Sequence, residues 1–170
     1  MKRTILSFIV MLTAMAASAQ KFALVDMEYI LKNVPAYERA NEQLNQVSKK
    51  WESEVEALLK EAETLYKKYQ SEAVFLSDTQ KTKAEETIME KEKEASALKK
   101  KYFGSEGELY KKRQSLLAPI QDEIYNAVKD ICDQKGYQLV LDRASGGSII
   151  YASPKIDISD EVLTKLGYAY

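Results

Sequence analysis

The chain contains no histidine and only one cysteine, and both shortages narrow the chemistry open to it. Histidine is the commonest general base near neutral pH and a frequent metal ligand, so its absence removes the usual centre of either kind of site. A lone cysteine excludes an internal disulfide, and the helical spacing of Cys132 from Val128 predicts a buried structural thiol rather than a nucleophile. We therefore expect a protein that is not an enzyme, with no catalytic residue, metal ligand or cofactor-binding residue.

A large excess of charge of one sign is also missing. The whole chain has 25 basic and 26 acidic residues, a net charge of −1. Without the N-terminal leader described next, 23 basic residues remain against 26 acidic ones, a net charge of −3. Such a chain lacks the positive field expected of a nucleic-acid-binding protein.

The N-terminal segment has the pattern of a secretory signal peptide. Two basic residues precede an apolar run from Thr4 to Met15, which is too short to span a bilayer. The small residues of Ala17-Ser18-Ala19 then provide a cleavage site. The pattern predicts an exported protein whose leader is cleaved after Ala19, with an uncleaved membrane anchor as the alternative.

Three short segments have the composition of β-strands. Lys21–Asp26 and Tyr137–Asp142 alternate in hydrophobicity, and Ser148–Ala152 is rich in β-formers. Turn residues in Arg143–Gly147 join the last two segments into a predicted hairpin, with which the first strand must pair. Three short strands leave exposed sheet edges, which several copies of the chain closing into a barrel would remove.

A short helix is expected at each end of this β-rich part. Met27–Lys32 forms a helical turn directly after the first strand. Near the C-terminus, Ser159 is expected to cap a last helix, whose apolar contacts are Leu163 and Leu166.

Between Pro35 and Gly136 the chain has almost no turn residues, which predicts two very long helices folded back on each other. From Ala40 to Tyr69 apolar residues recur about every 3.6 positions and form one narrow stripe. The first helix is expected to run from Pro35 to about Phe75. Ser77-Asp78-Thr79 supplies the capping residues of the return helix.

Three residues are expected to disturb the return helix. Gly104 and Gly107 each cost about 1 kcal/mol against alanine in a helix, so they predict a soft spot or hinge unless they are simply tolerated. Pro119 can kink the helix further along.

The surface of this helical arm is evenly charged. Residues 36–115 include 16 basic and 16 acidic side chains, intermixed, as is typical of a solvated coiled coil rather than a catalytic cluster. Val74, Phe75 and Leu76 form an apolar triplet at the expected tip, where they either close the hairpin or touch a bound protein. The residues expected to contact such a protein are Val74, Phe75, Leu76, Ile88 and Tyr102.

Short sequence patterns near both ends of the chain occur in a characteristic order. They are Phe22–Met27, Ile30-Leu31, Val34-Pro35, Pro119-Ile120, Ile124, Val128, Gly136-Tyr137, Leu139–Asp142, Ile149–Tyr151 and Asp157–Ser159. In this order and spacing the chain resembles the Skp/OmpH family of periplasmic chaperones over essentially its whole length.

The resemblance implies an α+β fold: a long antiparallel helical hairpin, the coiled-coil arm, on a small β body that trimerises as a β-barrel. Three arms would enclose a cavity that holds unfolded outer-membrane β-barrel proteins in the periplasm without ATP. No lipid-binding site is implied, because the chain is not basic, and membrane contact is expected to be weak or absent. The residues expected in the trimer body are Phe22, Leu24, Leu139, Leu141 and Ile150.

These expectations divide the chain into a signal peptide (1–19), a β-rich body (20–35 and 116–170) and an arm (36–115). The expected function is a periplasmic holdase chaperone that prevents the aggregation of unfolded outer-membrane proteins. The alternative is a structural coiled-coil spacer or adaptor of a cell-envelope complex. A spacer would be expected to have a stronger and more regular apolar stripe than this chain has.

Overall fold

The computed structural model describes residues 21–145 and 149–168, so the predicted signal peptide and its cleavage site lie outside the described residues. The chain forms two compact units. One unit, called the body here, contains the described residues up to Asn33 and those from Glu123 onward; the other, called the arm, is Val34–Asp122. Helix α5, Glu108–Lys135, contributes residues to both units.

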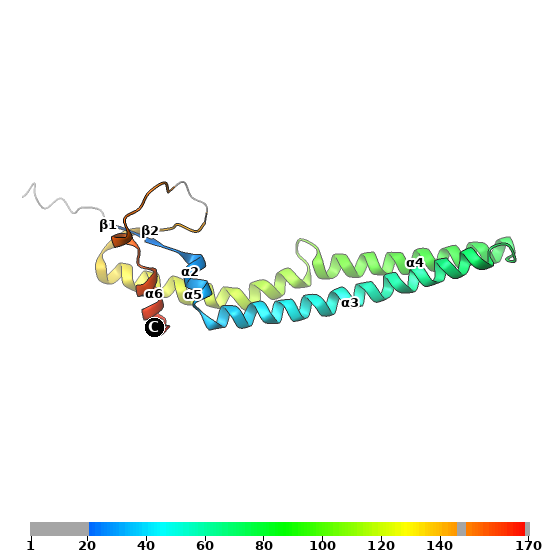
Figure 1. Ribbon diagram of the computed structural model, residues 1–170, viewed down its shortest axis with the longest axis horizontal. Coiled ribbons are helices and arrows are strands. Elements are labelled where there is room, and N and C mark those ends of the chain that lie inside the picture. Colours follow the sequence, from blue (N-terminus) through cyan, green and yellow to red (C-terminus); the bar gives the residue numbers. More distant parts are fainter. Residues whose placement is uncertain (1–20, 146–148, 169–170) are drawn as a thin grey trace, which may run out of the picture. The chain divides into compact units, whose positions relative to one another are not determined.

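The body is built on two parallel strands that come from distant parts of the chain (Figure 1). Strand β1, Lys21–Val25, pairs with β2, Tyr137–Asp142. The first two of the three predicted strands are thereby confirmed, as is the pairing of the first strand with the C-terminal part of the chain. Strand β1 ends one residue early because Asp26 accepts a hydrogen bond from the Tyr29 N–H and caps the next helix.

The predicted third strand, Ser148–Ala152, is wrong for the residues that the structure describes. Residues 149–152 belong to no strand, and Ile150 is fully exposed. The second edge of β1 is met instead by a single parallel bridge from Leu24 to Asp157.

The predicted hairpin fails because of how the chain leaves β2. The Arg143 N–H donates to the Val25 carbonyl at 2.9 Å, and the Arg143 guanidinium contacts Asp26 and Asp157. The residue after β2 is thus held at the end of β1, and the chain goes on to the other edge of β1, where Asp157 forms its bridge with Leu24, so residues 149–152 do not run back along β2.

Three short helical elements complete the body. They are α2 (Met27–Lys32), the 3₁₀ helix η1 (Pro154–Ile156) and α6 (Ser159–Lys165). The prediction that Ser159 caps α6 is wrong: Ile158 occupies the cap position, and Ser159 is the buried first residue of the helix. The buried apolar residues of the body are Ala23, Leu24, Val25, Ile30, Ile124, Ala127, Ile131, Ile158, Val162 and Leu163.

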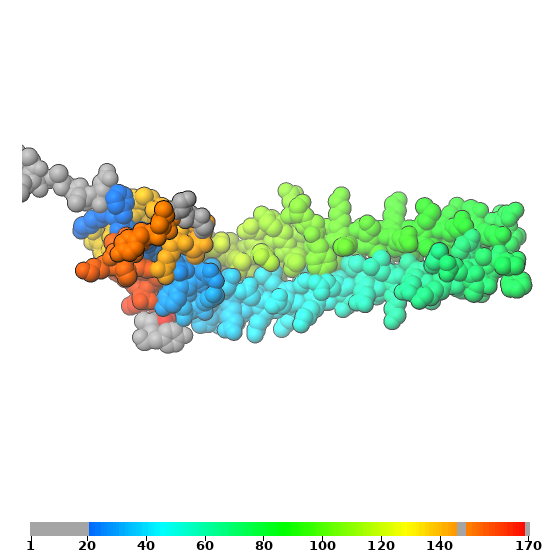
Figure 2. Space-filling view, turned by 45° about the horizontal axis from the view of Figure 1, so that its top comes forward, coloured from blue at the N-terminus to red at the C-terminus, as the bar shows by residue number. Residues whose placement is uncertain are grey.

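The arm is a helical hairpin, as predicted. Helix α3, Pro35–Glu72, packs along α4, Asp78–Phe103, and Figure 2 shows the two side by side. Ser77 and Gln80 form a capping box that starts α4. Ala62 and Ala95 are 4% and 1% exposed, and such small buried side chains permit close packing of the two helices. No described helix is long and apolar enough to cross a membrane.

The return helix is interrupted at the predicted soft spot. Helix α4 ends at Phe103 and α5 begins at Glu108, with Gly104 and Gly107 at the two ends of the break. The interruption is thereby confirmed, whereas motion at this point stays a prediction. Pro119 lies inside α5, which continues on both sides of it.

Candidate binding surfaces

The tip of the arm exposes two large apolar side chains. Val74 and Phe75 are each 87% exposed, while their neighbour Leu76 is half-buried. The tip is held between the end of α3 at Glu72 and the capping box at Ser77. Of the apolar triplet, only Leu76 is placed to help close the hairpin, so Val74 and Phe75 remain open to another molecule.

Ile88 and Tyr102 are engaged within the arm. Ile88 is 7% exposed on α4. The Tyr102 ring stacks on Trp51 with 4.6 Å between centroids, and its hydroxyl donates to Glu54 at 2.5 Å. That hydrogen bond raises the pKa of Tyr102, since it favours the protonated phenol. Tyr102 therefore joins α4 to α3, and Ile88 is buried, so neither side chain is open to another molecule.

Other apolar side chains of the arm are more open, and they are not among the contacts predicted from the sequence. Leu59 and Tyr66 of α3 are 50% and 49% exposed, and Met89 of α4 is 67% exposed. Leu59 lies in an open groove between the two helices together with Val55 and Phe103. The sequence did contain a signal for two of these residues. Leu59 and Tyr66 each come directly after a residue of the apolar stripe of α3, so they widen the apolar face of that helix.

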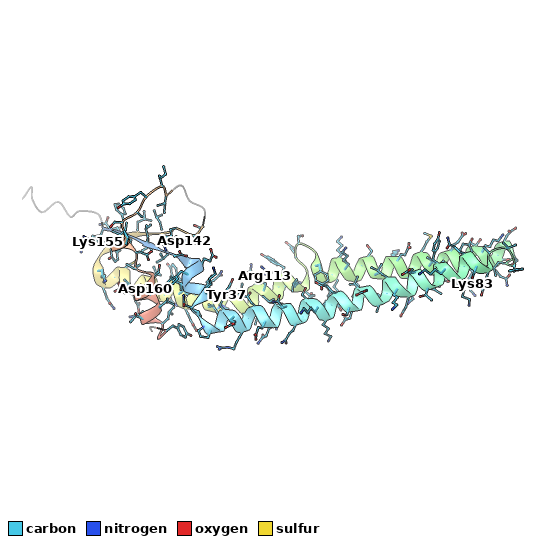
Figure 3. The ribbon with its side chains drawn as sticks, viewed as in Figure 1. Tyr37, Lys83, Arg113, Asp142, Lys155 and Asp160 are labelled. Carbon is cyan, nitrogen blue, oxygen red and sulfur yellow. The ribbon has the colours of Figure 1, made fainter. Side chains whose placement is uncertain are left out.

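Ion pairs and polar hydrogen bonds also join the two helices elsewhere in the arm. Lys91 of α4 forms an ion pair with Glu61 of α3 at 3.3 Å, and the Tyr69 hydroxyl donates to Glu85. Figure 3 shows charged side chains projecting from the arm, among them Lys83 and Arg113. Residues 36–115 carry equal numbers of basic and acidic side chains, so the arm as a whole has little long-range field.

One face of the two-stranded sheet is apolar and half-exposed. Phe22 lies opposite Leu139 in the strand register, and these two side chains and Leu141 are between 44% and 47% exposed. Leu24 lies opposite Leu141 but is itself only 5% exposed. Ile150 is an additional apolar side chain of the body that is open to solvent. This group contains all five residues expected in the trimer body.

A polar cluster joins the ends of both strands to the start of α6. The Arg143 Nε donates to Asp26 at 3.0 Å, and its Nη1 lies 3.2 Å from Asp157. The Ser159 hydroxyl donates to Asp157 at 2.6 Å and accepts from the Asp26 N–H at 2.8 Å. The hydrogen bond from the Tyr29 N–H is the largest cause that holds the pKa of Asp26 below its ordinary value; burial opposes it, and the Arg143 guanidinium lowers the pKa further. The cluster satisfies its own groups, which favours a structural role.

The surroundings of Cys132 do not activate its thiol. The residue is half-buried rather than fully buried, and burial together with nearby Asp133 raises the pKa of its thiol. A raised pKa lowers the fraction of nucleophilic thiolate. Within residues 21–145 and 149–168, no group of histidine, cysteine or acidic side chains could hold a metal ion.

Comparisons with known proteins agree with this geometry. The family described as "Outer membrane protein (OmpH-like)" matches residues 21–166. A protein named Chaperone protein Skp from Yersinia enterocolitica is 28% identical over 159 residues, covering 90% of this chain and 92% of its own length. A protein of the same name from Photorhabdus luminescens is 26% identical over 158 residues, covering 91% and 90%.

A solved structure has the same fold. It is described as an OmpH-like outer membrane chaperone from Caulobacter crescentus CB15 and superposes with a TM-score of 0.69. The match covers 89% of this chain and 86% of the other, at 12% sequence identity.

Proposed function

Since this chain belongs to the OmpH-like outer membrane protein family, we propose that it is an ATP-independent holdase chaperone. Its clients would be unfolded outer-membrane proteins in the periplasm, which it would keep from aggregating. Membership of a family that includes the Skp chaperones also agrees with the expectation that the chain is not an enzyme.

The observation that carries the proposal is the combination of this family match with an arm that offers scattered apolar contacts. Leu59, Tyr66, Val74, Phe75 and Met89 are each about half exposed or more, and they are spread along both helices and the tip. Each such contact is weak, because it is small and surrounded by charged residues. Many weak contacts can retain an unfolded chain without fixing it in one conformation, which is what a holdase requires.

We further propose that the working form is a trimer whose bodies assemble through their sheets. The support is the half-exposed face formed by Phe22, Leu139 and Leu141, together with the exposed Ile150. Covering apolar surface of this kind with a second copy removes it from water, which favours assembly. No strand of the described residues pairs with the outer edge of β2, and this edge would accept a strand from a neighbouring copy, as the predicted barrel requires.

An aggregation assay tests the proposed function. A urea-unfolded outer-membrane barrel protein is diluted into buffer, and light scattering is followed with and without the chaperone. We expect the full protein to suppress scattering, and a variant that lacks residues 51–98 to retain a folded body but lose this protection. A structural spacer would not suppress scattering in either form, and protection by the armless variant would refute binding through the arms.

Two side chains at the tip allow a finer test. Replacing Val74 and Phe75 by serine removes apolar surface without disturbing the packing of α3 on α4, since both are exposed. We expect client binding to weaken roughly 30-fold, because burying each of the two side chains is worth about 1 kcal/mol at a partly covered site, or about 2 kcal/mol together. Tyr125→Ser is the matched control, because Tyr125 is an exposed aromatic residue of the body.

A further inference from the structure

The break between α4 and α5 is built so that only glycine fits at its two ends. A Cβ added to Gly104 would lie 2.5 Å from the Lys100 carbonyl oxygen. A Cβ added to Gly107 would lie 2.7 Å from the Tyr102 carbonyl oxygen and 2.9 Å from that of Lys101. These are backbone atoms, which cannot move aside as a flexible side chain would. The loop therefore folds tightly over the end of α4 and depends on both glycines.

The same four residues could also be helical. Gly104–Gly107 amounts to about one helical turn, and the residues on both sides are already helical. The Gly104 N–H still donates to the Lys100 carbonyl at 2.9 Å, and the Lys111 N–H donates to the Gly107 carbonyl at 3.1 Å. Helical hydrogen bonding thus reaches the loop from each side.

The opposite helix does not share the interruption. Helix α3 is continuous from Pro35 to Glu72. Tyr102, two residues before Gly104, stacks on Trp51 of α3 and donates a hydrogen bond to Glu54 of the same helix. This contact fixes the end of α4 in register with α3. Gly104–Gly107 therefore cannot become helical unless one helix of the hairpin slides along the other by about 6 Å.

From these observations we propose that Gly104–Gly107 is a stored helical turn that gives the arm two lengths. In the form described here the turn is looped out. In the second form α4 and α5 fuse into one helix from Asp78 to Lys135, and the return leg is longer by one turn. The contact of Tyr102 with Trp51 and Glu54 holds the looped form. The inference concerns the free protein and does not depend on the proposed chaperone activity.

The proposal predicts two distances that can be separated. Ser96 of α4 and Ser115 of α5 are exposed and lie on opposite sides of the loop. In one continuous helix their 19-residue separation spans about 29 Å, whereas with four residues looped out the remaining 15 span about 23 Å. Cysteines at these two positions, in a Cys132→Ser background, would carry spin labels for pulsed electron-spin distance measurements. Labelled chain is refolded with a large excess of unlabelled chain, so that only pairs within one chain contribute.

We expect the otherwise unmodified protein to show a main population near 23 Å and a minor one near 29 Å. Tyr102→Leu should raise the minor fraction at least twofold, because it removes the stack and the hydrogen bond to Glu54. Replacing both Gly104 and Gly107 by alanine should make the longer distance the main one. The matched control is Ser105→Ala with Glu106→Ala in the same loop, which should leave the distribution unchanged.

A single population near 23 Å that Tyr102→Leu leaves unchanged would overturn the proposal, and so would a control that shifts as far as the glycine variant. If the glycine variant does not fold, the unmodified protein and Tyr102→Leu still show whether the arm has two lengths.

Discussion

At the scale of single residues, the polar cluster around Arg143 links distant parts of the chain. It joins Asp26, which follows β1, to Asp157, which precedes α6. No sequence pattern marks this cluster, because its members are far apart along the chain; Asp26 and Arg143 are separated by 117 residues. A sequence period reports only on neighbours along one helix or strand, and therefore cannot indicate which charges meet in the fold.

We expect Arg143→Met to destabilise the body by about 1 kcal/mol, since it removes two charge-assisted contacts from a half-exposed side chain. Lys155→Met is the control, because it removes an exposed positive charge elsewhere in the body. Chemical unfolding followed by circular dichroism would compare the two variants. Equal effects would show that the specific contacts of Arg143 contribute nothing beyond its charge.

The same cluster predicts that the free energy of unfolding falls at acid pH. The folded-state pKa of Asp26 is lowered below its ordinary value of 3.8, so the stability that it contributes is present above pH 3.8 and is lost as the pH falls through the lower folded-state value. Arg143 supplies part of this lowering, after the Tyr29 N–H, so the difference in unfolding free energy between the unmodified protein and Arg143→Met should shrink as the pH is lowered below 3.8. A difference that stays constant from pH 7 to pH 2.5 would contradict this assignment.

At the scale of elements, the sequence predicted the long helices well and the C-terminal strand badly. The apolar stripe of α3, with Leu44, Val55 and Ala62 buried, is a local signal that repeats over many turns. The residues at Ile149–Tyr151 are good strand formers, but a strand also needs a partner edge, and after β2 the chain goes on to the other edge of β1 at Asp157. The local apolar period therefore decided the helices, whereas tertiary contacts decided the strand.

Close packing of the arm should be sensitive to side-chain size at Ala95. This residue is 1% exposed where α4 packs on α3, so Ala95→Leu has no room and should destabilise the arm by about 1–3 kcal/mol. Ala97→Leu is the matched control, because Ala97 is exposed on the same helix. Amide exchange in α3 and α4 should quicken only in the first variant. Similar exchange in both would mean that the two helices are not packed this closely in solution.

At the scale of the whole molecule, assembly is the expected source of stability for a small body. The proposed trimer would cover Leu141, which is 44% exposed on β2. Leu141→Asp should therefore abolish assembly and lower the melting temperature together, because folding and association would be one event. Gln138→Asp, a change at an exposed residue of the same strand, should do neither. Sedimentation and thermal melts at several protein concentrations would check this, and a stable folded monomer at micromolar concentration would exclude the trimer.

Client binding by the complete protein should depend only weakly on salt. Residues 36–115 carry 16 basic and 16 acidic side chains, so their long-range field is small. Raising the salt from low to physiological concentration should change client affinity by less than about tenfold, or 1.4 kcal/mol. A steep loss of binding would show instead that local basic groups such as Lys99-Lys100-Lys101 make the main contacts.

The parallel pairing of β1 with β2 also has a consequence for the order in which the chain folds. The first strand is made early, yet its partner begins at Tyr137, so the sheet cannot form until nearly the whole chain is present. Closing so long a loop is slow for a random coil, whereas the hairpin between them needs only contacts that grow outward from its tip. We expect α3 and α4 to form first and to shorten the effective loop, so the arm would act as the internal scaffold on which the two ends of the chain find each other.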